Sequence, residues 1–376
     1  MTMRSFKNIL YLGRKELFSF LNDTMLLAFV IYAFSAGIYT TARGVSFELR
    51  NAPVAIVDLD HSQLSRRIAS ALTPPYFITP VEIAFTEIDE NMDFGRYTFV
   101  LVIPEHFESD VIAGKQPELQ VNIDATIVAH AGIGAGYIQT IIMREVMDFL
   151  NRDEGRYVLP VTIEPRVAFN PNLKQEWFIS VMQIINHVTL LAIILTGAAL
   201  IRERERGTID HLLVMPITPA EIMAAKCWAN GAVILVATAF ALIVMVQIVL
   251  RVPIAGSVTL FLAGAALYLF SATAIGIFLG TIARSMPQLS LLIMLTILPM
   301  HMLSGGSTPR ENQPEIVQWA MSFVPSTHFV AFAQAVLYRG AGLATVWPYL
   351  LLVTVLGLAF FVVALMRFRR AMAAMR

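Results

Sequence analysis

Charged residues are scarce in this chain. Asp, Glu, Lys and Arg make up 14% of its 376 residues, whereas ordinary soluble domains contain about 25%. Hydrophobic residues make up 57%, and most of them are gathered in long runs. The composition therefore argues against an ordinary soluble protein and predicts an integral membrane protein.

Several chemical motifs are also missing. Cys227 is the single cysteine, so neither an intramolecular disulfide nor a thiolate metal cluster can form. The phosphate-binding pattern G-x-x-x-x-G-K-[ST] does not occur, so we expect no ATP hydrolysis and no bound cofactor in this chain. Gly132, Gly134 and Gly136 stand near the start of a predicted helix, where they favour close packing or flexibility over nucleotide binding. Basic residues flank the apolar runs and the net charge is zero, which argues against a nucleic-acid partner.

Six apolar runs have the length, or nearly the length, of a membrane span, which needs about 20 residues. We predict spans at Met25–Thr41, Trp177–Ile201, Trp228–Leu250, Val258–Ile282, Leu289–Leu303 and Trp347–Met366. Residues 3–21 are amphipathic and predict a helix in the membrane interface rather than a cleaved signal peptide. Deep Asp or Glu residues are missing from all six runs, which argues against a proton-coupled carrier.

Residues 43–175 differ from the rest, because charges and turn residues return there. Short apolar or alternating runs predict strands at 53–58, 97–104 and 119–124, with a further strand possible at 161–166. Helices are expected from Asp60 or Ser62 to Leu72, in a short segment ending at Gly114, and over 126–151. The fold class is therefore a polytopic α-helical membrane protein with an inserted mixed α/β domain. We divide it into an elbow helix (1–23), a first span (24–42), the inserted domain (43–175) and a membrane domain with spans two to six (176–370).

The distribution of Lys and Arg in the short flanks predicts the orientation. Most of them lie at the two termini, in the 202–226 loop and at Arg284, whereas Arg251, Arg310 and Arg339 stand in the loops of the other side. Positive charge in short loops marks the cytoplasmic side. We therefore expect both termini in the cytoplasm, a multi-pass protein of a bacterial inner membrane, and the inserted domain outside the cytoplasm.

The loop after the second span contains a block of charge followed by an apolar pattern. Residues 202–206 are all charged, and Ile209, Leu212, Leu213 and Pro216 then recur at helical spacing. Thr218, Pro219 and Glu221 form a helix start with a capping box. A solvated connector explains the charges alone, whereas a docking helix for a soluble partner also explains the apolar face and the capped restart.

Two stretches resemble the family of ABC type-2 transporter permeases. The first is Glu203-Arg204-Glu205-Arg206-Gly207-Thr208-Ile209 with Leu212-Leu213-Val214-Met215-Pro216-Ile217 and Glu221. The second is Leu303-Ser304-Gly305-Gly306-Ser307-Thr308-Pro309-Arg310 with Pro314-Glu315 and Val324-Pro325-Ser326-Thr327-His328-Phe329. The resemblance covers residues 175–370 by motif and the first third of the chain by layout, and the long external domain is similar to the drug-exporter branch.

This resemblance implies a permease subunit without catalytic residues or metal of its own. Two such chains, or this chain and a paralogue, would line the pathway in the lipid bilayer. A cytoplasmic ATP-binding cassette ATPase, which uses ATP and Mg²⁺, would bind residues 202–221. Ile209, Leu212, Leu213 and Met215 would be its buried contacts, and Glu203, Glu205 and the arginines Arg204 and Arg206 would set the register. The external domain would collect substrate or dock a periplasmic adaptor, which with an outer-membrane channel would complete export.

Two polar or irregular segments could belong to the pathway itself. Gln183, Asn186 and His187 share one helical face of the second span, where hydrogen bonds between helices and a pathway lining are equally compatible with the pattern. Residues 304–328 contain Gly305, Gly306, Pro309 and Pro325 among apolar residues. They fit either an external loop or, as we favour, short re-entrant helices that form an outer gate.

Two other classes of function remain as alternatives. A membrane-anchored sensor or scaffold whose external domain binds a ligand or partner explains the inserted domain but not the six spans and the coupling stretch. A membrane enzyme lacks support, because no triad order, metal cluster or carboxylate pair stands out. His61, His106 and His130 are scattered and fit ordinary surface histidines.

Overall fold

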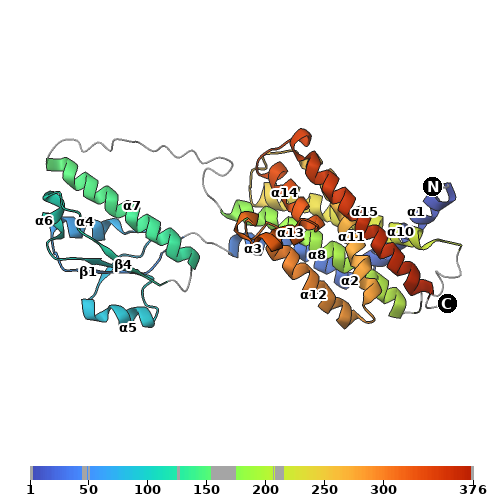
Figure 1. Cartoon of the computed structure of the whole chain (residues 1–376), viewed down its shortest axis with the longest axis horizontal. Helices are drawn as coiled ribbons and strands as arrows, with labels where there is room; N and C mark the ends of the chain where they lie inside the picture. Colours follow the sequence, from blue (N-terminus) through green and yellow to red (C-terminus); the bar gives the residue numbers. More distant parts are fainter. Residues whose placement is uncertain are drawn as a thin grey trace. The chain divides into compact units, whose positions relative to one another are not determined.

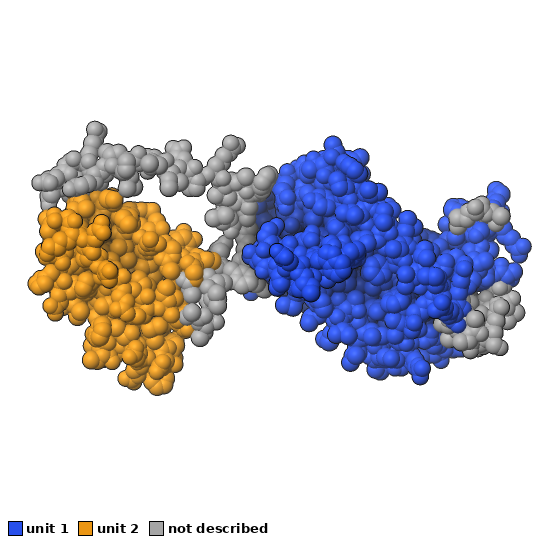
Figure 2. Space-filling view, viewed as in Figure 1, with its two compact units in different colours: residues 1–45, 167–376 blue, residues 46–166 orange. Residues whose placement is uncertain are grey.

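The computed structural model describes residues 3–44, 49, 51–124, 128–153, 175–205, 207 and 216–373. The chain forms two compact units (Figure 2). Unit 1 contains Met1–Val45 and Val167–Arg376, and unit 2 contains Ser46–Arg166. The division predicted from the sequence places the inserted domain at residues 43–175.

Unit 1 is a helical bundle (Figure 1). Within the described residues, six helical stretches are long and apolar enough to cross a membrane, in agreement with the prediction. They are Thr24–Gly44, Glu176–Glu205, Pro219–Val249, Val258–Ile282, Met286–Leu303 and Leu343–Arg370. The corresponding elements are α2 (Thr24–Tyr32), η1 (Ala33–Gly37) and α3 (Ile38–Gly44); α8 (Gln175–Glu205); α10 (Pro219–Phe240) and η3 (Ala241–Val249); α11 (Val258–Ile282); α12 (Met286–Leu303); and α15 (Leu343–Ala373).

α11 occupies the centre of this bundle. It packs against α8, α10, α14 and α15, and its buried positions include several small residues such as Gly276 and Gly280. An added Cβ at Gly276 would lie 2.6 Å from the Ile193 carbonyl oxygen of α8. Glycine at this position therefore allows the two helix backbones to approach closely, as in other membrane helix pairs.

The third span begins earlier than predicted. The sequence places its start at Trp228, after the charged residue Lys226, whereas α10 starts at Pro219 and continues as one helix. The sequence analysis counted Lys226 in the 202–226 loop, whereas the structure places it inside α10. Its side chain is 3% exposed and lies between two carboxylates, which allows the apolar helix to include it.

Two short helices follow α12, and the predicted re-entrant character of segment 304–328 stays a prediction. They are α13 (Glu315–Met321) and α14 (Pro325–Leu337), preceded by the single turn η4 (Arg310–Asn312). The axes of α13 and α14 meet at 89°, so this pair is either a broken span or a re-entrant loop. The N-terminal helix α1 (Met3–Leu21) has the bounds predicted for the elbow helix.

Unit 2 is a four-stranded sheet with helices on its faces. The strands are β1 (Val54–Asp58), β2 (Val81–Glu82), β3 (Phe99–Ile103) and β4 (Gln120–Ile123), in the order β2-β1-β3-β4. β1 runs parallel to β2 and β3, whereas β4 is antiparallel to β3, with Leu101 opposite Val121. The helices are α4 (Gln63–Ala71), η2 (Phe85–Glu87), α5 (Ile88–Asp93), α6 (Phe107–Ile112) and α7 (Val128–Asp153).

The two faces of the sheet carry separate cores. Val54, Ile56, Phe99 and Leu101 pack on one face with residues of α4, α6 and α7. Ala55, Val57, Val100 and Val102 pack on the other face with Ile88 of α5. Because helices cover both faces of the sheet, the sequences of β1 and β3 are nearly continuous apolar runs rather than alternating ones. These runs were predicted correctly as strands. β2 and α5 were not predicted, and the possible strand 161–166 lies outside the described residues.

Candidate functional site

The predicted coupling element, 202–221, begins inside a helix. α8 continues through Glu205, and Gly207 then adopts a φ of +69°, in the left-handed region that favours glycine. The middle of the element lies outside the described residues. This applies to the predicted contacts Arg206, Thr208, Ile209, Leu212, Leu213 and Met215. The structure therefore describes the frame that holds this loop, from the end of α8 to exposed Pro216 and the start of α10.

The start of α10 has the predicted cap. The Glu221 backbone N–H donates to Thr218 Oγ1 at 3.3 Å, and the Thr218 N–H donates to Glu221 Oε2 at 2.8 Å. This is a complete capping box with Pro219 at the first turn. Ser5 of α1 also donates its hydroxyl to Glu221 Oε1, so the cap connects α10 to the elbow helix.

A buried ionic cluster joins three helices beside this cap. Lys226 of α10 lies 3.1 Å from Glu16 Oε1 of α1 and 2.8 Å from Glu203 Oε2 of α8. Lys15 of α1 lies 3.5 Å from the other oxygen of Glu203. Burial raises the pKa of Glu16, against the opposing effect of the Lys226 ammonium. We call Glu16, Glu203 and Lys226 the ionic cluster.

Further contacts fix α1 to the bundle. The Trp228 indole N–H donates to the Ile9 carbonyl at 3.1 Å. An added Cβ at Gly13 would lie 2.2 Å from the Trp228 ring, so this ring of α10 packs directly on the α1 backbone at Gly13. Arg202 of α8 pairs with Asp23, which also caps α2. The elbow helix is therefore held to α8 and α10 by charge, hydrogen bonds and close packing.

The end of α8 is also tied to the turn between α11 and α12. Arg204 donates from Nη1 to the Ala283 carbonyl at 2.6 Å. Glu205 Oε1 accepts from the Met286 backbone N–H, the first residue of α12, at 3.2 Å. A displacement of the end of α8 would therefore be transmitted to α1, α10 and α12 together.

These contacts give new partners to side chains that were predicted to face an ATPase. Glu203, Arg204, Glu205 and Glu221 all bind groups of unit 1. Sequence reasoning did not find these contacts of Glu16, Gly13 and Trp228, and it counted Lys226 in the 202–226 loop. Their local signals are weak, because the partners lie about 200 residues apart in sequence.

The polar group of the second span lies on one face of α8, as its spacing predicts. Gln183, Asn186 and His187 share the partly buried face of α8, but the Asn186–Gln183 contact is long at 3.5 Å. His187 packs edge-on against Phe34 of η1, with ring centroids 6.0 Å apart. An apolar cleft of about 740 Å³ runs instead between α8 and α12, and His301 lines it rather than these three residues. The pathway role of Gln183, Asn186 and His187 stays a prediction.

The predicted gate residues lie where α12 passes into α13 and α14. Gly305 has a φ of +91°, and an added Cβ at Gly306 would lie 2.2 Å from Met182 of α8. Pro325 is buried at the first turn of α14, and Pro309 precedes the turn η4. These residues shape a tight bend, whereas their role as an outer gate stays a prediction.

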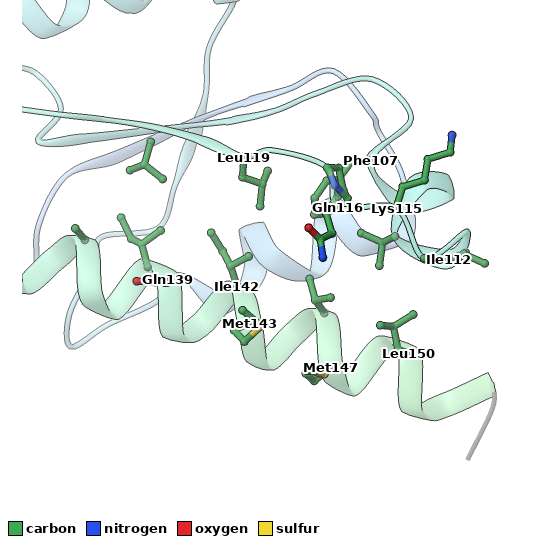
Figure 3. Close-up of a pocket in the computed structure, with 17 residues that line it drawn as sticks. Phe107, Ile112, Lys115, Gln116, Leu119, Gln139, Ile142, Met143, Met147 and Leu150 are labelled. Carbon is green, nitrogen blue, oxygen red and sulfur yellow. The ribbon is translucent and has the colours of Figure 1, made fainter. Parts of the chain in front are cut away.

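Unit 2 contains a groove between α7 and the segment from α6 to β4 (Figure 3). Its volume is about 800 Å³, and the side chains of Ile142 and Leu150 of α7 point toward the segment that carries Phe107 and Leu119. Met143 and Met147 of α7 also line the groove. Lys115, Gln116 and Gln139 supply its polar groups. A mostly apolar groove of this size with a few polar groups has the character of a small-molecule site.

Comparisons with known proteins agree with the helical layout and the two motifs. Residues 18–366 match the family described as ABC-2 family transporter protein. The chain is 53% identical to the inner membrane transport permease YhhJ of Escherichia coli K12 over 373 residues, covering 99% of this chain and 100% of that protein. It is 28% identical to the probable multidrug ABC transporter permease YbhR of the same organism, covering 91% of this chain and 93% of that protein. With a family match over most of its length, the chain belongs to the ABC-2 family of transporter permeases.

Proposed function

We propose that this permease forms, as a dimer, the substrate pathway of an ATP-driven exporter and receives its energy from a separate cytoplasmic ATPase through residues 202–221. Membership of the ABC-2 family implies an ATP-binding cassette partner and a membrane location. The proposal assigns the partner's contact to the apolar residues of the loop, Leu212 and Leu213 above all.

The observation that carries this proposal is the frame around the loop. Both helices that flank it are fixed to α1 through the ionic cluster and the Glu221 cap, and α8 is also bonded to the start of α12. Movement imposed on the loop would therefore reach four helices without first deforming a flexible connector. A conformational change of the ATPase pair can act on the pathway only through such a connection.

A second chain is proposed to pack along α12. This helix exposes Leu291, Met294, Leu295 and Leu298 and borders the cleft with α8. Apolar side chains on such a face suit either lipid or another helix, and the adjoining cleft favours a shared pathway over lipid alone. The second chain would be a copy of this one or a paralogue.

Unit 2 is proposed to lie outside the cytoplasm and to meet the substrate in its groove, where an apolar molecule would lie along α7. Flexible methionines allow such a groove to adapt to molecules of different shape. YbhR is named a probable multidrug permease, and the same substrate class is proposed for this chain. An adaptor and an outer-membrane channel would complete export.

The coupling assignment is tested by co-purification. The chain is co-expressed with its ATP-binding cassette partner, and Leu212→Asp with Leu213→Asp is expected to release the ATPase while the permease itself is recovered. Phe94→Asp, on an exposed residue of unit 2, is the control and is expected to keep the complex. Unchanged recovery of the ATPase with the double variant would disprove the assignment.

A further inference from the structure

A polar cavity lies beside the bend between α12 and α14. It has a volume of about 500 Å³ and is bounded by residues 304–311, by α14 and by the first residues of α8 and α15. The rings of Phe178 and Tyr349 form the apolar part of the cavity wall, whereas Arg310, Thr327 and Arg339 contribute hydrogen-bond donors to the lining. This cavity adjoins the cleft between α8 and α12 at Ser307 but contains none of the residues of the ionic cluster.

Two buried polar atoms in this cavity lack a partner within the part of the chain that the structure describes. Thr327 is fully buried, and its Oγ1 makes no hydrogen bond. Arg310 Nε is likewise buried without a partner, and Arg310 Nη2 makes only a long contact of 3.4 Å with the Gln318 carbonyl. Leaving such groups unsatisfied costs free energy, because they lose hydration without gaining a hydrogen bond.

The positive charge of this cavity is also uncompensated. Neither Arg310 nor Arg339 forms an ion pair with a described carboxylate. Glu311 also lines the cavity, where it is exposed and its one negative charge stands against the two positive charges of Arg310 and Arg339. A partly buried guanidinium that pairs with no described carboxylate can bind an oxyanion, which accepts hydrogen bonds from two of its N–H groups.

The backbone leaves room for such a ligand. Gly305 lines the cavity in a left-handed conformation, and a Cβ added there would point at the aliphatic part of Arg310, 3.2 Å away. Gly306 is bounded on its other side by Met182. A side chain at Gly305 would therefore displace the guanidinium that the ligand requires.

The neighbouring aromatic residues bear on the depth of this cavity. Trp319 of α13 is 67% exposed and Trp347 at the start of α15 is 56% exposed. Tryptophan is enriched where a helix enters the headgroup layer of a membrane. Two exposed tryptophans in the elements next to the bend are compatible with a position near the headgroup layer.

We propose that this cavity binds a phosphoryl oxyanion, supplied by the headgroup of an anionic phospholipid or by free phosphate. Arg310 would hold the oxyanion through its guanidinium, Thr327 would donate its free hydroxyl, and Arg339 would add charge from the rim. The proposal concerns the isolated permease and goes beyond its coupling to an ATPase.

The test measures lipid binding to the purified full chain in detergent by native mass spectrometry. The probes are dihexanoyl phosphatidylglycerol, dihexanoylglycerol without a phosphate, and inorganic phosphate as competitor. The proposal predicts saturable binding of one phosphatidylglycerol. It also predicts that Arg310→Gln weakens this binding about tenfold or more, since a charge-assisted hydrogen bond is lost. Competition by inorganic phosphate would identify a general phosphate site, and saturable binding without competition would identify a lipid headgroup site.

Two variants separate this effect from misfolding. Thr327→Val replaces the hydroxyl by a methyl group of similar size and is expected to weaken phosphatidylglycerol binding several-fold. Arg251→Gln removes an exposed arginine in the loop before α11, and it is expected to leave binding unchanged. The proposal fails if Arg310→Gln and Thr327→Val both bind phosphatidylglycerol as wild type does. It also fails if both variants lose binding of dihexanoylglycerol, which has no phosphate, to the same extent as they lose binding of phosphatidylglycerol.

Discussion

Replacement of Lys226 by Met tests whether the ionic cluster is a true buried pair. The single variant leaves the Glu16 and Glu203 carboxylates together in a site where both are largely buried. Removal of one partner from a buried ion pair costs about 3–5 kcal/mol, because the remaining charge stays without compensation. Lys15 lies near Glu203 but is 55% exposed, so it would offset little of this cost.

The triple variant Glu16→Gln, Lys226→Met, Glu203→Gln removes the charges and keeps the side-chain volumes. Uncharged replacements of a buried ion pair are often neutral or stabilising. We therefore expect the triple variant to recover most or all of the stability that the single variant loses. The assay is the fraction of detergent-purified chain that stays monodisperse after heating, compared with wild type across a temperature series.

The same variants separate stability from coupling. If the cluster transmits movement, the triple variant should still bind the ATPase, and the ATPase in that complex should hydrolyse ATP. Export of substrate should be poor, since uncharged side chains hold α1 less firmly to α8 and α10. A single variant as stable as wild type would refute the pairing. A triple variant as unstable as the single one would show that lost packing, and not an unpaired carboxylate, causes the loss.

Two further predictions concern unit 2 and the orientation. Met147→Asp, which places a charge in the apolar groove, should reduce export several-fold without releasing the ATPase. The control Phe94→Asp should leave export unchanged. Export by each variant is measured as transport of substrate into inverted vesicles. In a Cys227→Ala background, a cysteine at Phe94 should react with a membrane-impermeant maleimide in spheroplasts, whereas a cysteine at Arg284 should react only after permeabilisation. The reverse pattern would invert the predicted topology.

Local signals predicted the parts of this fold that depend on local physics. The bounds of α1, the Thr218–Glu221 capping box and the buried strands β1 and β3 follow from residue type and spacing over a few positions. β2 has two residues, so its pattern is too short to be recognised. A short element of this kind forms only because the edge of β1 is available to pair with it.

The ionic cluster could not be predicted in the same way. The five charges at 202–206 read as a solvated block, whereas Glu203, Arg204 and Glu205 each find a partner in another helix. Which partner each one finds depends on how α1 and the α11–α12 turn pack, and sequence spacing contains no information on this. Lys226 illustrates the same limit, since a lysine in a flank and a lysine in a buried pair look alike in sequence.

The long separation of the ionic cluster along the chain also has a consequence for biosynthesis. Glu16 emerges from the ribosome 210 residues before Lys226. At about 5–20 residues per second this separation corresponds to roughly 10–40 s of synthesis. During that interval α1 has neither Lys226 nor the Trp228 surface against which Gly13 packs, so the carboxylate of Glu16 must stay in contact with water at the membrane surface. The elbow helix therefore reaches its final position only after the third span has been made, although it precedes that span in the chain by about 200 residues.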